Sequence, residues 1–174
     1  IEGLNDGKTD IIMSSMSMTT ARRYVINFSD PYLMVGQMGL VRRVDLNKYL
    51  FGFPPNLPGT TGVLKGTTGD FLVQREFPKS KRKAFTSATD AAEALKKKKI
   101  DLFISDSTLI WYLAGTHATD DLSAVQIVLS EEPLAWGVRK GDDAFLGAVN
   151  AFVKKARADG TFNRVFQRWT AVGP

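Results

Sequence analysis

The side chains best suited to hold a ligand follow short apolar runs of the sequence. Three serines and an arginine follow residues 11–13, two threonines follow residues 62–64, and an aspartate follows residues 102–104. These side chains are Ser14, Ser15, Ser17, Arg22, Thr67, Thr68 and Asp106. A guanidinium can grip a carboxylate through two parallel N–H bonds, and a carboxylate can neutralise an ammonium group. The set therefore predicts binding of a zwitterion, helped by amide donors from helix starts at Thr19 and Thr68.

Composition argues against catalysis and against metal chemistry. The 174 residues include no cysteine and one histidine, His117. Thiolate chemistry, disulfides and cysteine-bound metals are therefore excluded, and one histidine leaves little for a His-based metal site or a Ser-His triad. No run reaches the roughly 18 apolar residues of a membrane span. We expect no catalytic residue, no metal and no cofactor.

The net charge of +5 could suggest an anionic partner. The densest basic run is Lys96–Lys99, which has no interleaved aromatic residues. Such a run is typical of a solvated helix end, and no motif for reading a nucleic-acid groove is present. We therefore expect no nucleic-acid partner, neither DNA nor RNA.

Helices and strands alternate around the candidate residues in the manner of an α/β fold. A helix that ends at Gly7 precedes the apolar run 11–13, and a helix over 88–95 precedes the run 102–104, which indicates a weak internal duplication. Short apolar strands that follow helices are typical of buried parallel strands. Ligands bind outside the carboxyl ends of such strands, where the candidate residues lie.

Two extended segments, 37–43 and 125–129, enclose the middle of the chain. A chain that leaves one lobe, builds another and returns makes two adjacent crossovers, which is the hinge geometry of a two-lobed binding protein. We therefore assign residues 1–43 and 126–174 to lobe 1 and residues 44–125 to lobe 2. Each lobe is expected to be a mainly parallel sheet flanked by helices.

The C-terminal part predicts two amphipathic helices. The first is capped by Asp142 or Asp143 and is ended by Gly160, and the second begins at Thr161. Their predicted inward residues are Phe145, Leu146, Val149, Phe152, Val153 and Ala156, then Phe162, Val165, Phe166 and Trp169. Their predicted solvated residues are Lys154, Lys155, Arg157, Arg164 and Arg168.

Several motifs add a resemblance to these physical arguments. Residues 7–22 and 28–32 match a GKxD, S/T-x-T-x-x-R and FSDPY signature, and shorter matches follow at 64–68, 100–106, 138–142 and 158–161. In this order they resemble the bacterial extracellular solute-binding proteins, family 3. The resemblance implies a type II periplasmic-binding-protein-like fold with two lobes and two hinge strands. It further implies a periplasmic or extracytoplasmic protein that binds a free α-amino acid between its lobes and delivers it to the permease of an ABC transporter.

The resemblance also implies residue roles. Arg22 would pair with the ligand α-carboxylate, helped by Ser17 and by the amide and hydroxyl of Thr68. Ser15 would contribute to the α-amino group, which Asp106 would neutralise. The second choices nearby are Ser14 and Thr67. The ligand would bridge the lobes and stabilise a closed form.

Structural alternatives exist for the two charged residues. Arg22 could be a surface residue at the start of a helix, beside Arg23. Asp106 could be the N-cap of a helix over 107–113, a role compatible with ligand binding.

The first residue is Ile1, whereas family members begin with a further βα portion of lobe 1. We therefore expect a chain cut at its N-terminus, with the signal peptide and part of the selectivity residues ahead of Ile1. An N-terminal fragment or a second copy would complete lobe 1.

Two other functions fit the same fold. A cyclohexadienyl or arogenate dehydratase would need a general acid, for which Glu131, Glu132 and Asp106 are the candidates. A ligand-sensing domain of a membrane receptor or histidine kinase is the other alternative.

Overall fold

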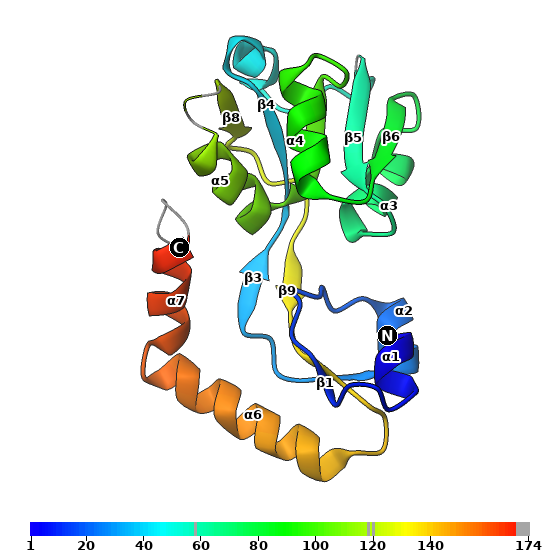
Figure 1. Ribbon diagram of the computed structural model, residues 1–174, viewed down its shortest axis with the longest axis vertical. Helices are drawn as coiled ribbons and strands as arrows, with labels where there is room; N and C mark the ends of the chain where they lie inside the picture. The colour runs from blue at the N-terminus through cyan, green and yellow to red at the C-terminus, as the bar shows by residue number, and fades with distance from the viewer. Residues whose placement is uncertain (58, 118, 120, 170–174) are drawn as a thin grey trace. The chain divides into compact units, whose positions relative to one another are not determined.

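A computed structural model of the chain describes residues 1–57, 59–117, 119 and 121–169 (Figure 1). The chain forms two compact units. Unit 1 comprises Ile1–Val35 and Glu131–Trp169, and unit 2 comprises Gly36–Ser130. The predicted lobe boundaries, at 43/44 and 125/126, lie inside unit 2. The difference arises because the strand over 37–42 pairs within the sheet of unit 2 and does not belong to unit 1.

Unit 2 is built on a five-stranded sheet with the order β6-β5-β7-β4-β8. Its strands are β4 (Gln37–Arg42), β5 (Thr60–Leu64), β6 (Lys81–Phe85), β7 (Leu102–Asp106) and β8 (Leu122–Val125). Strand β5 pairs in parallel with β6 and β7, whereas β4 runs antiparallel to β7 and β8. The sheet is therefore mixed, because the strands that enter and leave unit 2 run against the βαβ strands.

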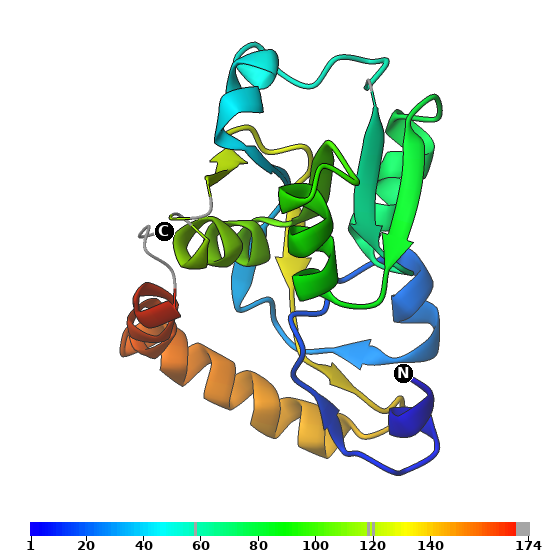
Figure 2. The ribbon, with the colours of Figure 1, turned by 45° about the horizontal axis from the view of Figure 1, so that its top comes forward.

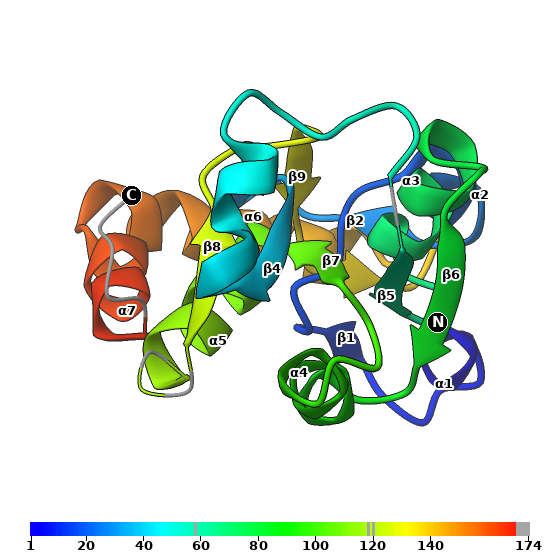
Figure 3. The ribbon, with the colours of Figure 1, turned by 90° about the horizontal axis from the view of Figure 1, so that it is seen from above.

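Helices cover both faces of this sheet (Figures 2 and 3). They are η1 (Arg43–Tyr49), α3 (Thr68–Glu76), α4 (Ala88–Lys96) and α5 (Ser107–Thr116). Side chains of α4 and α5 pack with Leu40 and Phe103 in one buried cluster. Side chains of η1 and α3 pack with Val41 and Ile104 in another. Neighbouring strand residues thus point to opposite faces and give each face its own apolar core, as the pleat requires.

Unit 1 contains short strands, and its described strand pairs are antiparallel. Its elements are α1 (Glu2–Asn5), β1 (Ile11–Ile12), α2 (Thr20–Val25), β2 (Asn27–Phe28), β3 (Leu33–Val35), β9 (Glu132–Leu134), β10 (Gly137–Val138), α6 (Asp143–Ala158) and α7 (Thr161–Trp169). The strand orders are β1-β10-β2 and β3-β9. The expectation of a buried parallel strand at 11–13 was wrong: β1 is half-buried and antiparallel to β10, and Met13 is 59% exposed. A partner from the far end of the chain sets this direction.

The C-terminal helices confirm the predicted starts and correct the predicted faces. Asp142 caps α6, because its Oδ1 accepts a hydrogen bond from the Phe145 amide at 3.1 Å. Val149 and Val153 are buried against Trp136. The helix α7 has no buried residue, however, and its apolar Val165 and Trp169 are 53% and 65% exposed. Phe152 of α6 is also half-exposed, at 52%.

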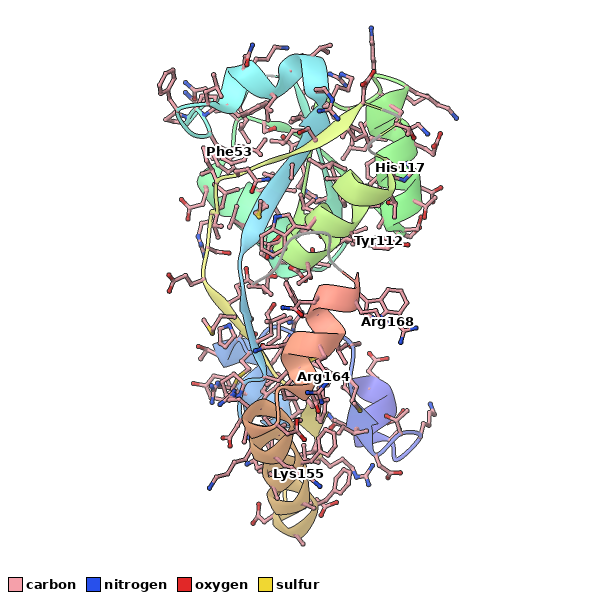
Figure 4. All side chains as sticks on the ribbon, turned by 90° about the vertical axis from the view of Figure 1, so that its left-hand side faces the viewer. Phe53, Tyr112, His117, Lys155, Arg164 and Arg168 are labelled. Carbon is pink, nitrogen blue, oxygen red and sulfur yellow. The ribbon has the colours of Figure 1, made fainter. Side chains whose placement is uncertain are left out.

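The basic residues of these two helices lie on the surface, as predicted; Figure 4 labels Lys155, Arg164 and Arg168. Across the residues that the structure describes, no helix combines the length and the apolar character needed to cross a bilayer.

Candidate ligand-binding site

A buried glutamine joins two of the predicted site residues in unit 2. Gln37 is fully buried on β4 and lies opposite Asp106, the last residue of β7. Its Nε2 donates hydrogen bonds to Asp106 Oδ1 at 2.6 Å and to Thr68 Oγ1 at 3.1 Å. The structure therefore brings Thr68 and Asp106 together at the carboxyl end of the parallel strands. We call Gln37, Thr68 and Asp106 the polar cluster.

Sequence reasoning missed Gln37. The available signal was one polar residue directly before the apolar run 38–41. A polar side chain in a buried strand needs hydrogen-bond partners, and here the partners are the predicted site residues.

A glycine permits the close approach of α3 to this cluster. A Cβ atom on Gly69, the second residue of α3, would lie 2.5 Å from Gln37 Oε1 and 3.4 Å from the Ile104 carbonyl oxygen. A larger residue would push the first turn of α3 away from β4 and β7. Gly69 therefore helps to place Thr68 within hydrogen-bond distance of Gln37.

Thr67 has a structural task in the same turn. Its hydroxyl donates to the Leu64 carbonyl at 2.8 Å and accepts from the Asp70 amide at 3.3 Å, which makes it the N-cap of α3. The buried Asp70 carboxylate accepts from the Gly66 amide at 2.9 Å and from Arg82 at 2.7 Å. Thr67 and Asp70 thus hold the turn that presents Thr68.

Asp106 occupies the N-cap position of α5, as its structural alternative predicts. Its side chain makes no capping hydrogen bond, however. The carboxylate instead accepts a hydrogen bond from Gln37 Nε2. Its orientation is therefore set by the polar cluster and not by the helix that follows it.

In unit 1 the structure brings Ser17 and Arg22 together. Ser17 is buried and forms an isolated β-bridge with Leu134 of β9. Arg22 Nη1 donates to the Ser17 carbonyl oxygen at 2.8 Å, and the Ser17 hydroxyl donates to Glu132 Oε2 at 2.7 Å. Thr19 caps the short helix α2 by accepting from the Arg22 amide at 3.2 Å. Glu132 is thereby added to this group.

Arg22 differs from most arginines of the chain in its partners. Among the described residues, no carboxylate lies within ion-pair distance of its half-buried guanidinium, whereas Arg42, Arg82 and Arg139 each pair with aspartate. The neighbouring Arg23 is exposed, and its guanidinium donates to the Met18 sulfur at 3.9 Å. Arg22 is thus a positioned cation with N–H groups to offer to a carboxylate.

Ser14 and Ser15 are exposed in the loop after β1. Ser15 has a φ of 51°, in the left-handed region. Within the described part of the chain, neither side chain is hydrogen-bonded to the Ser17–Arg22 group. The structure therefore does not join these two predicted residues to the others. The described residues also include no cluster of three or more acidic, histidine or cysteine side chains suited to a metal ion.

The comparisons with known proteins agree on one family. The bacterial extracellular solute-binding proteins, family 3, match residues 1–172. The ABC transporter glutamine-binding protein GlnH of Bacillus subtilis is 27% identical over 98% of this chain and 61% of its own length. The chain thus spans about three fifths of that relative.

Solved structures share the fold. A putative binding component of an ABC transporter from Wolinella succinogenes, complexed with lysine, superposes with a TM-score of 0.87 at 26% identity, over 98% of this chain and 74% of that one. An ancestral amino-acid-binding protein, described as a precursor of cyclohexadienyl dehydratase, has a TM-score of 0.84 at 29% identity, over 97% and 72%. The expected type II α/β fold is confirmed.

Proposed function

Because this chain belongs to family 3 of the bacterial extracellular solute-binding proteins, we propose that it binds a free α-amino acid outside the cytoplasm for delivery to an ABC transporter. The proposal rests on Arg22, whose half-buried guanidinium is anchored on the Ser17 carbonyl and has no carboxylate partner among the described residues. The names of the compared proteins, which include glutamine and lysine as ligands, support this class of ligand.

In the proposed mode, Arg22 grips the α-carboxylate. A guanidinium carries five N–H donors, so the bond to Ser17 leaves enough for a bidentate carboxylate. The hydroxyl of Ser17 already donates a hydrogen bond to Glu132 Oε2. Ser17 therefore supports the carboxylate through its hold on Arg22, with Ser14 and Ser15 as additional polar groups of the same loop.

The polar cluster supplies the complementary group for the α-ammonium. A carboxylate has about four acceptor positions, so Asp106 can accept from Gln37 and from an ammonium at once. Thr68 Oγ1 accepts from Gln37, so its own proton can be donated to the ligand. Thr67 acts indirectly, as the cap that places Thr68. Binding of both charged groups of one ligand would favour a closed state of the protein.

A thermal-shift screen tests the proposal. The full-length protein is heated with each proteinogenic amino acid, and a ligand at about 100 times its Kd should add about 2.7 kcal/mol to the free energy of unfolding. The amide of the best ligand, which lacks the carboxylate, and its N-acetyl derivative, which lacks the ammonium, serve as controls and should give no shift. An equal thermal shift with the amide would show that Arg22 does not bind the ligand carboxylate. The absence of a shift with every amino acid would count against amino-acid binding.

A dehydratase is the second candidate. Glu132 favours it, because this carboxylate lies 2.7 Å from Ser17 and so adjoins the proposed carboxylate grip, where a general acid could act. The resemblance to a precursor of cyclohexadienyl dehydratase points the same way, although that precursor is itself described as an amino-acid-binding protein. Turnover of prephenate or arogenate that is abolished by Glu132→Gln would decide for the enzyme, and no turnover would decide against it.

A further inference from the structure

The end of unit 2 opposite the polar cluster carries a concentration of lysines. The polar cluster lies where β7 ends, whereas β5, β6 and β7 begin at the other end, because these strands are parallel. Figure 1 shows η1 and the start of β5 together at that end. We call the exposed lysines there the basic end; they are Lys48, Lys79, Lys81, Lys97, Lys98 and Lys99.

Backbone and side-chain contacts hold the parts of the basic end together. Lys48 and Gly59 line one pocket of about 200 Å³ with Asp101. The Lys81 amide donates to the Gly59 carbonyl at 3.3 Å. Arg42, which precedes η1, donates to the Ile100 carbonyl at 2.8 Å, directly after the lysine run. The lysines before β6, after α4 and in η1 therefore share one surface.

The segment that supplies most of the basic end is strongly positive. Residues 79–101 contain eight lysines and arginines against three acidic residues, so the net charge of this segment, +5, equals that of the whole chain. Lys79, Lys81, Lys98 and Lys99 have no acidic partner within ion-pair distance among the described residues. Basic residues on an edge strand also discourage aggregation, which accounts for those of β6, Lys81 among them, but not for the run after α4.

Exposed apolar side chains lie in and directly after η1, the segment that also carries Lys48. Phe51 is completely exposed, at 103%, and Val44 and Leu50 are 82% and 59% exposed. Phe53, two residues beyond Phe51, instead packs on Tyr49 and Phe77 with ring centroids 5.4 and 6.4 Å apart. The loop after η1 is thus anchored through Phe53, which Figure 4 labels, while Phe51 projects from it.

We propose that the basic end binds the surface of a bilayer that contains anionic phospholipids. Lysines near such a surface are attracted by its negative potential, and exposed Phe and Leu side chains can enter the boundary between headgroups and acyl chains. A nucleic acid would use the lysines but not the apolar tip of Val44, Leu50 and Phe51. This proposal is separate from amino-acid binding, because it uses none of the residues assigned to the ligand.

Vesicle flotation tests the proposal with the full chain. The chain should float with vesicles of phosphatidylcholine and phosphatidylglycerol and stay unbound with vesicles of phosphatidylcholine alone. Binding should weaken as salt rises from about 0.05 to about 0.5 M, because the Debye length shortens. Absence of binding to the anionic vesicles would overturn the proposal.

Matched variants separate this surface from general charge attraction. Each lysine near an anionic surface contributes about fivefold to binding, so K98Q/K99Q should weaken vesicle binding at least tenfold. K154Q/K155Q changes the net charge equally, but on α6 of unit 1, and should stay within twofold of the parent. An equal loss in both pairs would reduce the effect to net charge and would refute the basic end as the binding surface.

Phe51→Ser distinguishes a bilayer from a soluble polyanion. This substitution should weaken vesicle binding severalfold and leave retention on heparin or polyaspartate unchanged. Circular dichroism checks that the variants remain folded. The bilayer proposal would be wrong if Phe51→Ser left vesicle binding unchanged, or if the chain bound polyaspartate tightly without binding vesicles. Either result would favour a nucleic acid or an acidic protein as the partner.

Discussion

Replacing Arg22 gives the most direct test of the proposed ligand grip. Arg22→Ala removes the guanidinium that is held 2.8 Å from the Ser17 carbonyl, together with every N–H it offers to a carboxylate. Arg22→Lys keeps the charge, but a lysine cannot hold Ser17 and a carboxylate through a planar fork at the same time. The two substitutions therefore separate the loss of charge from the loss of geometry.

The burial of Arg22 sets the expected size of the effect. Removing one member of a fully desolvated charge pair costs about 2 to 5 kcal/mol of binding free energy. Since Arg22 is half-buried, we expect the lower part of this range, about 2 to 3 kcal/mol, for Arg22→Ala. This corresponds to a loss of about 30- to 150-fold in Kd. Arg22→Lys should lose one charge-assisted hydrogen bond, about 1.5 kcal/mol or roughly tenfold.

Calorimetry with the amino acid that gives the largest thermal shift measures both losses. Arg23→Ala is the matched control, because Arg23 is the adjacent residue of α2, carries the same charge and donates its guanidinium to the Met18 sulfur. Its Kd should stay within twofold of the parent. A loss below threefold for Arg22→Ala, or equal losses for Arg22→Ala and Arg23→Ala, would remove Arg22 from the site.

Three further predictions concern the ligand ammonium group at Asp106, the crowded backbone at Gly36 and the buried phenol of Tyr49. Asp106→Asn should weaken amino-acid binding by about 2 to 5 kcal/mol in calorimetry while an N-acetyl ligand binds parent and variant equally weakly; an unchanged Kd would exclude Asp106. Gly36→Ala should lower the free energy of unfolding in urea by about 1 to 3 kcal/mol, because its Cβ would lie 1.9 Å from the Ser130 carbonyl oxygen. Gly147→Ala, which has open space around it in α6, should instead raise the free energy of unfolding by about 0.5 to 1 kcal/mol. Equal effects of the two substitutions would contradict the crowding at Gly36. Burial, with the nearby acidic groups, raises the pKa of Tyr49, so the stability that the neutral phenol contributes is complete below pH 10 and is lost as the pH rises through the raised pKa. In Tyr49→Phe the free energy of unfolding should therefore depend less on pH above pH 10. Identical alkaline profiles of parent and variant would show that another group is responsible.

Local patterns in the sequence predicted local structure well. The capping side chain of Asp142 and the helix over 88–95 before β7 follow from side-chain chemistry and periodicity within a few residues. The hydrogen bond from Arg22 to the Ser17 carbonyl was not predicted, although it is local too, since its members are five positions apart in the sequence. In each case the physical cause lies inside the segment, so no knowledge of distant residues was needed.

Partners that lie far apart in the sequence could not be predicted in the same way. Gln37 meets Asp106 across 69 positions, and this pairing depends on the register of β4 against β7. The direction of β1 depends on β10, which lies more than a hundred residues away. The apolar residues of α7 resemble a core face, although Val165 and Trp169 are exposed among the described residues. Periodicity shows which side of a helix is apolar but not what covers it.

The two ends of the unit 2 sheet have different chemical characters, although the same five strands carry both. Asp106 is the last of the five residues of β7, so four rises, about 13 Å, separate it from Leu102 at the basic end of the strand. Substitutions more than about 10 Å apart that share no partner act additively as a rule. Gln37, Thr68 and Asp106 share no hydrogen bond with the lysines of the basic end among the described residues. Amino-acid binding and bilayer binding should therefore respond independently, and a variant such as K98Q/K99Q that lost both would have damaged the shared core and not a surface.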